Sequence, residues 1–177
     1  MKKIRRVLKS NFFNRPTPQV AEDLLGKYLV RQLSSGEIIY KMITEVEVYD
    51  GFKDKASHAS RGKTVRNTPM FGGSGYWYVY FTYGIYWVLN IVTREKDYPA
   101  AILIRGVEGI SGPARVTKHF SINKELNNQK ARRETGLWIE DRGVSIPKKK
   151  IKKTGRIGVN YAGPYWSKRR LRFLVAD

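Results

Sequence analysis

Two glutamates alternate with valines in the segment TEVEVY, residues 44–49. The alternation predicts a strand that carries Glu45 and Glu47 on one face. A glutamate inside a sheet costs free energy unless it is paired or has a chemical task. An ionised glutamate can act as a general base for a water molecule, and it can equally pair with one of the 34 lysines and arginines of the chain. The composition does not decide between the two roles or between the two glutamates.

Arg105 and His58 are further residues that could take part in chemistry. Arg105 lies in ILIRGVEG, which is apolar enough for a buried strand, and a buried arginine needs an acidic partner. A glutamate on a neighbouring strand would supply that partner, and the Glu–Arg pair would position and activate a water as a nucleophile. His58 lies in a polar loop, where a lone histidine is more often structural or solvated than catalytic.

An aromatic run, YWYVYFTYGIYWVLNIV (residues 76–92), is interrupted by Tyr83 and Gly84. Because glycine readily adopts positive φ, TYGI is predicted to be a tight turn between two strands. Tyr83 would lie at the tip of this hairpin, either in an ordinary frayed turn or as a wedge that fills the gap left by an extruded nucleotide in DNA. Tyr78 and Tyr80 share one face of the first strand, where they could stack on a base or pack in the core.

The elements that position these residues are predicted to be mainly strands. Strands are expected within residues 27–51 (two, around the turn SSGE), 76–92 (two), 98–110, 137–141 and 171–177. Within the second of these strands, one parity holds Ile43, Glu45, Glu47 and Tyr49, and the other holds Met42, Thr44, Val46 and Val48.

Two short helices are expected beside the strands. The first lies in RPTPQVAEDLLGKYL, with Thr17 as N-cap, Pro18 at the first helical position and Gly26 as the stop signal. The second is expected to start at Ser111, with Pro113 in its first turn.

The remaining segments are predicted to be loops. Residues 53–69 are polar and are expected to form a loop with one helical turn. Residues 147–156 contain KKKIKK and are expected to form a charged loop, because five lysines in six positions cannot pack into a core. The lysine runs would contact phosphates or simply form a solvated face.

The predicted fold class is therefore α+β. We expect a single mixed domain over residues 1–177, built on a curved, mainly antiparallel sheet with a protruding hairpin and flanking helices. Residues 1–10 would form a basic and flexible N-terminal segment.

The net charge of +19 favours binding to polyanions, namely nucleic acid or an anionic membrane. No apolar stretch reaches the length of about 18 residues that a membrane span needs, and the N-terminus lacks the apolar core of a signal peptide. The chain has no cysteine and only two histidines, His58 and His119, which argues against disulfides and zinc. We expect a metal-free cytoplasmic protein, associated with the nucleoid if it is bacterial.

Seven motifs follow one another in an order that carries a family resemblance: TEVEVYDG, SHASRGKTVRNTPMF, YVYFTYGIYWVLNIV, ILIRGVE, GPARVTK, RIGV and LRFLV. Together they closely resemble the alkyladenine (3-methyladenine) DNA glycosylase family from about residue 11 to the C-terminus. The resemblance implies a monofunctional glycosylase that needs no metal or cofactor. Its partner would be duplex DNA containing damaged purines, and the protein would be a monomer that binds no membrane.

The resemblance also implies roles for the residues that would activate water. Glu47 matches the family's general base, and Glu45 lies in a supporting position. Arg105 and the main chain of Val159 match the groups that hold the attacking water.

Further positions match the groups that would bind the flipped base. Tyr49 matches the ring that stacks on one face of the base, and His58 and Tyr80 match the rings on the other face. Asn90 matches the residue that crowds the amino group of guanine, and Tyr83 matches the residue inserted into the DNA stack.

Three positions depart from the pattern of the family. Ile85 follows the turn glycine where many members have methionine, and Asn160 and Tyr161 follow Val159 where glycine and often histidine are expected. These departures bear on the lesion preference.

The function predicted is excision of alkylated purines, with deaminated adenine as a second class of substrate, by flipping and by hydrolysis of the N-glycosidic bond to leave an abasic site. The alternative is a non-catalytic basic nucleic-acid-binding protein, such as one associated with RNA or ribosomes. A membrane-surface binder would need a basic amphipathic helix, which the sequence does not show.

Overall fold

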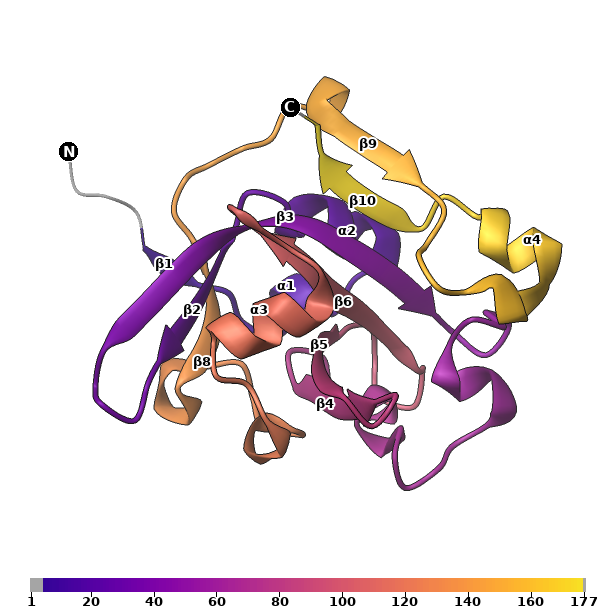
Figure 1. Ribbon diagram of the computed structural model, residues 1–177, viewed down its shortest axis with the longest axis horizontal. Coiled ribbons are helices and arrows are strands. Elements are labelled where there is room, and N and C mark those ends of the chain that lie inside the picture. Colours follow the sequence, from indigo (N-terminus) through magenta and orange to yellow (C-terminus); the bar gives the residue numbers. More distant parts are fainter. Residues whose placement is uncertain (1–4, 177) are drawn as a thin grey trace.

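A curled antiparallel sheet organises the fold, which is mixed α+β as predicted (Figure 1). The computed structural model describes residues 5–176. The main path of the sheet runs β1–β8–β2–β3–β6–β5–β4, while β10 joins β3 to β9 and β7 pairs with β6. The strands are β1 (Arg6–Val7), β2 (Tyr28–Gln32), β3 (Ile38–Asp50), β4 (Trp77–Thr82), β5 (Tyr86–Val92), β6 (Ala100–Val107), β7 (Ile110–Ser111), β8 (Leu137–Asp141), β9 (Ile151–Thr154) and β10 (Arg172–Val175). The helices are α1 (Ser10–Phe13), α2 (Thr17–Leu24), α3 (Pro113–His119) and α4 (Gly163–Lys168).

Strand β3 connects the two halves of the sheet. Its N-terminal half pairs with β2, and its C-terminal half pairs with β6 on one side and β10 on the other. The glutamates of TEVEVY therefore lie between two neighbouring strands, at the centre of the sheet rather than at an edge.

The register of β3 shifts beside Thr44, and this shift corrects the parity predicted for the strand. Ile43 lies in the main apolar core together with Val46 and Val48, although it is an odd number of residues away from Val46. A bulge inserts one residue into the alternation and so moves the side chains that follow to the other face. Glu45 and Glu47 follow it on the same face, as predicted, and both lie within ion-pair distance of one arginine.

The apolar core lies where the helices pack on the sheet. Helix α2 packs against β3 and β6, and α3 packs against β5, β6 and β7. Fully buried side chains of helices α1, α2 and α3 and of six strands belong to one core cluster; the largest in the cluster are Trp77, Phe13, Phe120, Leu24, Leu29, Ile43, Leu89, Ile91, Ile102, Ile104 and Leu137.

Both helix starts differ from the prediction. Pro16, not Thr17, is the N-cap of α2, and Thr17 is the first residue of the helix. Its buried hydroxyl instead donates a hydrogen bond to Asp50 Oδ1 (2.8 Å) and shares another with Thr93. Helix α3 begins at Pro113, because Ser111 belongs to strand β7.

The lysine-rich segment is also not a loop throughout. Residues 148–150 form a 3₁₀ turn, and β9 then pairs with β10 along its whole length. Strand pairing uses only backbone groups, and Lys152 and Lys153 extend from the strand into solvent, so their charges do not prevent it.

The basic N-terminal segment is part of the sheet where the structure describes it. Strand β1 pairs with the end of β8, and Leu8 is buried. The rest of the predicted flexible segment, residues 1–4, lies outside the described residues.

The loop after β3 brings three distant parts of the chain together. Figure 1 shows residues 51–75 lying between the β4–β5 hairpin and the C-terminal region that contains α4. Two 3₁₀ helices, His58–Arg61 and Thr68–Phe71, shape this loop.

Candidate active site

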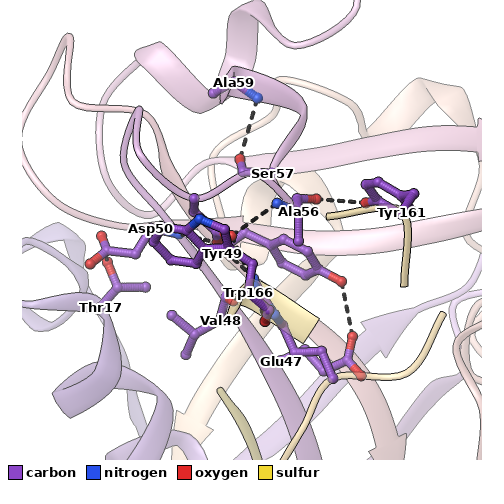
Figure 2. Close-up of polar contacts among 12 residues, drawn as sticks. Thr17, Glu47, Val48, Tyr49, Asp50, Ala56, Ser57, Ala59, Tyr161 and Trp166 are labelled. Carbon is purple, nitrogen blue, oxygen red and sulfur yellow. Dashed lines mark hydrogen bonds and ion pairs between the residues drawn. The ribbon is translucent and has the colours of Figure 1, made fainter. Parts of the chain in front are cut away.

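Glu47 is a fully buried carboxylate near the C-terminal end of β3. Its Oε1 accepts a hydrogen bond from the backbone N–H of Ile157 (2.8 Å), and its Oε2 accepts one from the hydroxyl of Tyr49 (3.0 Å). Figure 2 shows the Tyr49 hydroxyl pointing at this carboxylate. Burial raises the pKa of Glu47, and the Ile157 N–H, Arg105 and Tyr49 act against that rise.

Arg105 lies between the two glutamates, as the sequence predicts for a buried arginine. Its Nε is 2.9 Å from Glu45 Oε1 and 3.8 Å from Glu47 Oε1. The same nitrogen is buried and makes no hydrogen bond to an acceptor within residues 5–176, so the contact with Glu45 is ionic only. Arg172 on β10 approaches Glu45 Oε1 more closely, with its Nε at 2.6 Å.

The second arginine explains why Glu45 and Glu47 differ. Glu45 is paired with both Arg105 and Arg172, whereas the nearest arginine nitrogen to Glu47 is 3.8 Å away. Glu45 therefore has the character of a paired structural carboxylate. Less of the free-energy cost of burying Glu47 is offset, because its direct hydrogen-bond partners are uncharged.

A hollow of about 340 Å³, open mouth included, lies next to Glu47. Tyr49 connects the two, since its ring lines the hollow and its hydroxyl contacts the carboxylate. The hollow is lined by Tyr49, Ala56, Ser57, His58, Met70, Tyr78, Tyr80, Asn90, Ala101 and Tyr161. The four residues predicted to bind the base, Tyr49, His58, Tyr80 and Asn90, are all among them.

His58, Tyr78 and Tyr80 form one wall of the hollow. The His58 ring centroid is 4.8 Å from that of Tyr80, and the Tyr78 centroid is 5.0 Å from that of Tyr80. His58 Nδ1 and the Tyr78 hydroxyl are 3.1 Å apart and share a hydrogen bond. Burial lowers the pKa of His58 and the nearby charge of Arg66 lowers it further, so the imidazole is neutral at pH 7.

Asn90 lies on β5, opposite Tyr78 on β4. It is buried, and its Nδ2 donates to the backbone carbonyl of Tyr78 (3.2 Å), which fixes the orientation of the amide. The side chain is therefore a rigid part of the wall.

A buried ion pair supports the opposite wall. Both guanidinium arms of Arg156 donate to Asp54, with the NH2 contact at 2.9 Å, and Arg156 also donates to the carbonyl of Val48. The guanidinium carbon lies 4.9 Å from the centroid of the Tyr49 ring. Asp54 in turn accepts from the backbone N–H groups of Asp50 and Ala56, so this pair fixes the start of the loop that forms the hollow.

The hairpin tip extends away from the core, as predicted. Tyr83 and Gly84 both have positive φ (52° and 64°), and the N–H of Ile85 donates to the carbonyl of Thr82. This is the pattern of the type I′ turn that joins twisted strands. Tyr83 and Ile85 are 76% and 73% exposed, so two apolar side chains stand unprotected at one tip.

Val159 and Tyr161 bring the C-terminal region to the hollow. Val159 is buried beside Tyr49 and Ala56, and its carbonyl accepts a hydrogen bond from the N–H of Ala162. The exposed Tyr161 lines the hollow, and its hydroxyl donates to the carbonyl of Ala56 (2.7 Å). Figure 2 shows this contact beside the Tyr49 ring.

The structure thus divides the predicted site residues into three groups. Glu47 and Arg105 are in contact, and Tyr49, His58, Tyr80 and Asn90 surround the hollow. Tyr83 stands apart at the hairpin tip. The sequence alone did not single out the roles of Asp54, Arg156 and Arg172, whose partners are far away along the chain.

Two further findings concern residues 5–176. The structure brings no group of three His, Cys, Asp or Glu side chains together in a way that could hold a metal ion. Within the same range, no helix has both the length and the apolar character that crossing a membrane requires.

Comparison with known proteins agrees with this geometry. The family model described as methylpurine-DNA glycosylase (MPG) matches residues 11–111 and 108–177. The chain belongs to the methylpurine-DNA glycosylase family. This membership makes it a DNA glycosylase of the 3-methyladenine type, a hydrolase of DNA repair, and it confirms the resemblance seen in the motifs.

Three relatives of this glycosylase are provisionally named 3-methyladenine DNA glycosylase. The protein from Methanocella arvoryzae is 44% identical over 177 residues, which cover 89% of this chain and 86% of the relative. The protein from Ehrlichia chaffeensis is 36% identical and covers 97% of this chain and 94% of its own length. The protein from Wolbachia pipientis subsp. Culex pipiens is 47% identical over 130 residues, with coverages of 70% and 68%.

The buried pair that supports Tyr49 gives a stability prediction. Asp54→Ala should lower the free energy of unfolding by about 3–5 kcal/mol, because it leaves the buried guanidinium of Arg156 without its counter-charge. Denaturant unfolding measures the change. Asp23→Ala is the control, since it breaks the solvent-exposed pair with Arg15 and should cost at most about 1 kcal/mol. Equal effects of the two substitutions would contradict a structural role for the buried pair.

Proposed function

We propose that this glycosylase flips alkylated purines out of duplex DNA and hydrolyses their N-glycosidic bond with a water activated by Glu47. Deaminated adenine is a second proposed class of substrate. The observation that carries the proposal is the hydrogen bond from Tyr49 to Glu47, because it joins the wall of the hollow to the buried carboxylate. A base stacked on Tyr49 would have its glycosidic bond near a general base.

The environment of Glu47 suits a general base. Burial makes the carboxylate more basic than one in water, and the raised pKa brings it closer to the pH at which the enzyme works. The Ile157 N–H and the Tyr49 hydroxyl keep the carboxylate fixed. Burial raises the pKa of Tyr49 well above its ordinary value, so its hydroxyl keeps its proton and remains a donor.

Arg105 and Val159 would hold the attacking water. Among the residues that the structure describes, the buried Nε–H of Arg105 has no hydrogen-bond acceptor, and it lies close to Glu47. A buried donor of this kind is normally satisfied by a partner such as water. Arg172 and Glu45 would keep the Arg105 guanidinium in place, while the carbonyl of Val159 would retain a lone pair for the water beside its bond to Ala162.

The leaving base needs little chemical help from the protein. Alkylation at a ring nitrogen makes the purine cationic and a good leaving group. The faces of Tyr49 and Tyr80 attract a cation by about 0.5–2 kcal/mol each, and the neutral His58 does not repel it. Asn90 would crowd the amino group of an undamaged guanine.

Tyr83 would occupy the space that the flipped nucleotide leaves. Its ring is at the end of a hairpin with a well-defined turn, and it is mostly exposed. An exposed aromatic ring on a basic protein is suited to insertion between DNA bases. The exposed Ile85 would enlarge the apolar tip.

The alternative of a non-catalytic nucleic-acid-binding protein fits the charge but not the site. A binding module gains nothing from a fully buried glutamate whose hydrogen-bond donors are both uncharged. Such a protein would bind DNA and release no base.

The direct test of the proposed base is Glu47→Gln. Gln cannot accept a proton from water, so release of 3-methyladenine or hypoxanthine from duplex DNA should be abolished while binding to the damaged duplex is retained. Base release is measured under single-turnover conditions, and binding is measured by titration. The exposed Glu108→Gln makes the same charge change elsewhere and should release base at the wild-type rate. Undiminished release by Glu47→Gln would remove the proposed role of this residue.

The wedge is tested at the hairpin tip. Tyr83→Ala should weaken stable flipping by about 1–3 kcal/mol, because the ring no longer stacks in the duplex. A fluorescent base analogue opposite the lesion reports the flipping equilibrium. Tyr83→Phe keeps the ring and should preserve flipping, as should Tyr165→Ala, which removes another exposed tyrosine. If Tyr83→Ala flips as well as the wild type, the tip is an ordinary turn.

A further inference from the structure

The two aromatic walls of the hollow each carry an arginine. The guanidinium carbon of Arg156 lies 4.9 Å from the ring centroid of Tyr49, and that of Arg66 lies 5.0 Å from the ring centroid of Tyr80. Neither arginine lines the hollow itself. Each charge therefore lies against a ring of the wall without lining the hollow itself.

The two arginines differ in how their charge is neutralised. Arg156 is buried and makes a two-pronged ion pair with Asp54. Arg66 is exposed, and over residues 5–176 it forms no ion pair with a carboxylate. Its NH2 donates to the backbone carbonyl of Phe81 (2.9 Å), which holds the guanidinium over the neighbouring Tyr80 ring. One wall thus has a neutral pair behind it, and the other has a net positive charge.

The charge of Arg66 reaches the groups of the hollow. Burial raises the pKa of Tyr78 to about 12, and Arg66 acts against this rise. Burial likewise raises the pKa of Tyr80, again opposed by Arg66, and both burial and Arg66 lower the pKa of His58. All three residues line the hollow, so a base bound there would lie in the same field.

We propose that Arg66 sets the selectivity of this site between cationic and neutral damaged bases, acting through the wall formed by Tyr80. The inference rests on the proposed function. The guanidinium of Arg66 lies 5.0 Å from the centroid of the Tyr80 ring. It would repel a cationic base stacked on that ring, even when water screens the two charges. Arg66 would therefore offset part of the attraction that the aromatic walls offer to an alkylated, cationic purine. It would leave the binding of a neutral base such as hypoxanthine unchanged.

The test compares one cationic lesion with one neutral lesion. Release of the damaged base from duplexes containing 7-methylguanine or hypoxanthine is measured under single-turnover conditions at pH 8, where His58 is neutral with or without Arg66. The rate constant for 7-methylguanine divided by that for hypoxanthine should be about 3- to 10-fold higher for Arg66→Met than for the wild type. Where hypoxanthine is released too slowly, dissociation constants are measured in the Glu47→Gln background. The value for the hypoxanthine duplex divided by that for the 7-methylguanine duplex should then rise by the same factor.

Two controls separate this role from general DNA binding. Arg66→Lys keeps the charge and should keep the wild-type ratio. Arg61→Met removes an exposed arginine from the same loop and should also keep it. Equal loss of activity toward both lesions in Arg66→Met, with a weaker salt dependence, would identify Arg66 as a phosphate contact and overturn the proposal.

An unchanged ratio in Arg66→Met would overturn the proposal as well. Failure of the proposed function looks different, because then the wild-type protein releases neither base. The ratio of dissociation constants in the Glu47→Gln background would still test Arg66 in that case.

Discussion

The burial of the Glu47 carboxylate is the constraint on which the site depends. Strand β3 carries it to the centre of the sheet, where the Ile157 N–H and the Tyr49 hydroxyl hold its two oxygens. Because folding raises its pKa, the ionised carboxylate lowers the free energy of unfolding at every pH above that pKa. The rest of the fold offsets this loss of stability. The result is a rigid and basic carboxylate beside a hollow lined by aromatic rings.

Three arginines complete this arrangement by pairing with two different carboxylates. Arg105 and Arg172 neutralise Glu45 and leave Glu47 with uncharged hydrogen-bond donors. Arg156 fixes the loop after β3 by its buried pair with Asp54 and packs behind one wall of the hollow. Part of the positive charge of the chain is thus used inside the fold, where single guanidinium groups pair with Glu45 and Asp54.

Local patterns in the sequence were sufficient for much of this account. Alternation placed Glu45 and Glu47 on one face of a strand, and the glycine in TYGI marked the hairpin tip that exposes Tyr83. Effects that depend on tertiary contacts were not predictable from local patterns. The bulge that moves the side chains after Thr44 to the other face arises from pairing with β6, and the partner of Asp54 is 102 residues away. Strand β9 likewise forms by backbone pairing with β10, although the lysine side chains of this segment indicated a loop.

The pH dependence of base release by the wild-type protein tests the role of Glu47 most directly. Single-turnover release of hypoxanthine avoids the acid lability of cationic lesions, and circular dichroism at each pH verifies that the protein is folded. The rate should be constant near neutral pH and fall about tenfold per pH unit below the pKa of Glu47. That midpoint should lie above 4.5, the ordinary value for a glutamate, because burial raises the pKa. A rate that stays constant down to pH 4.5 would contradict a buried glutamate base.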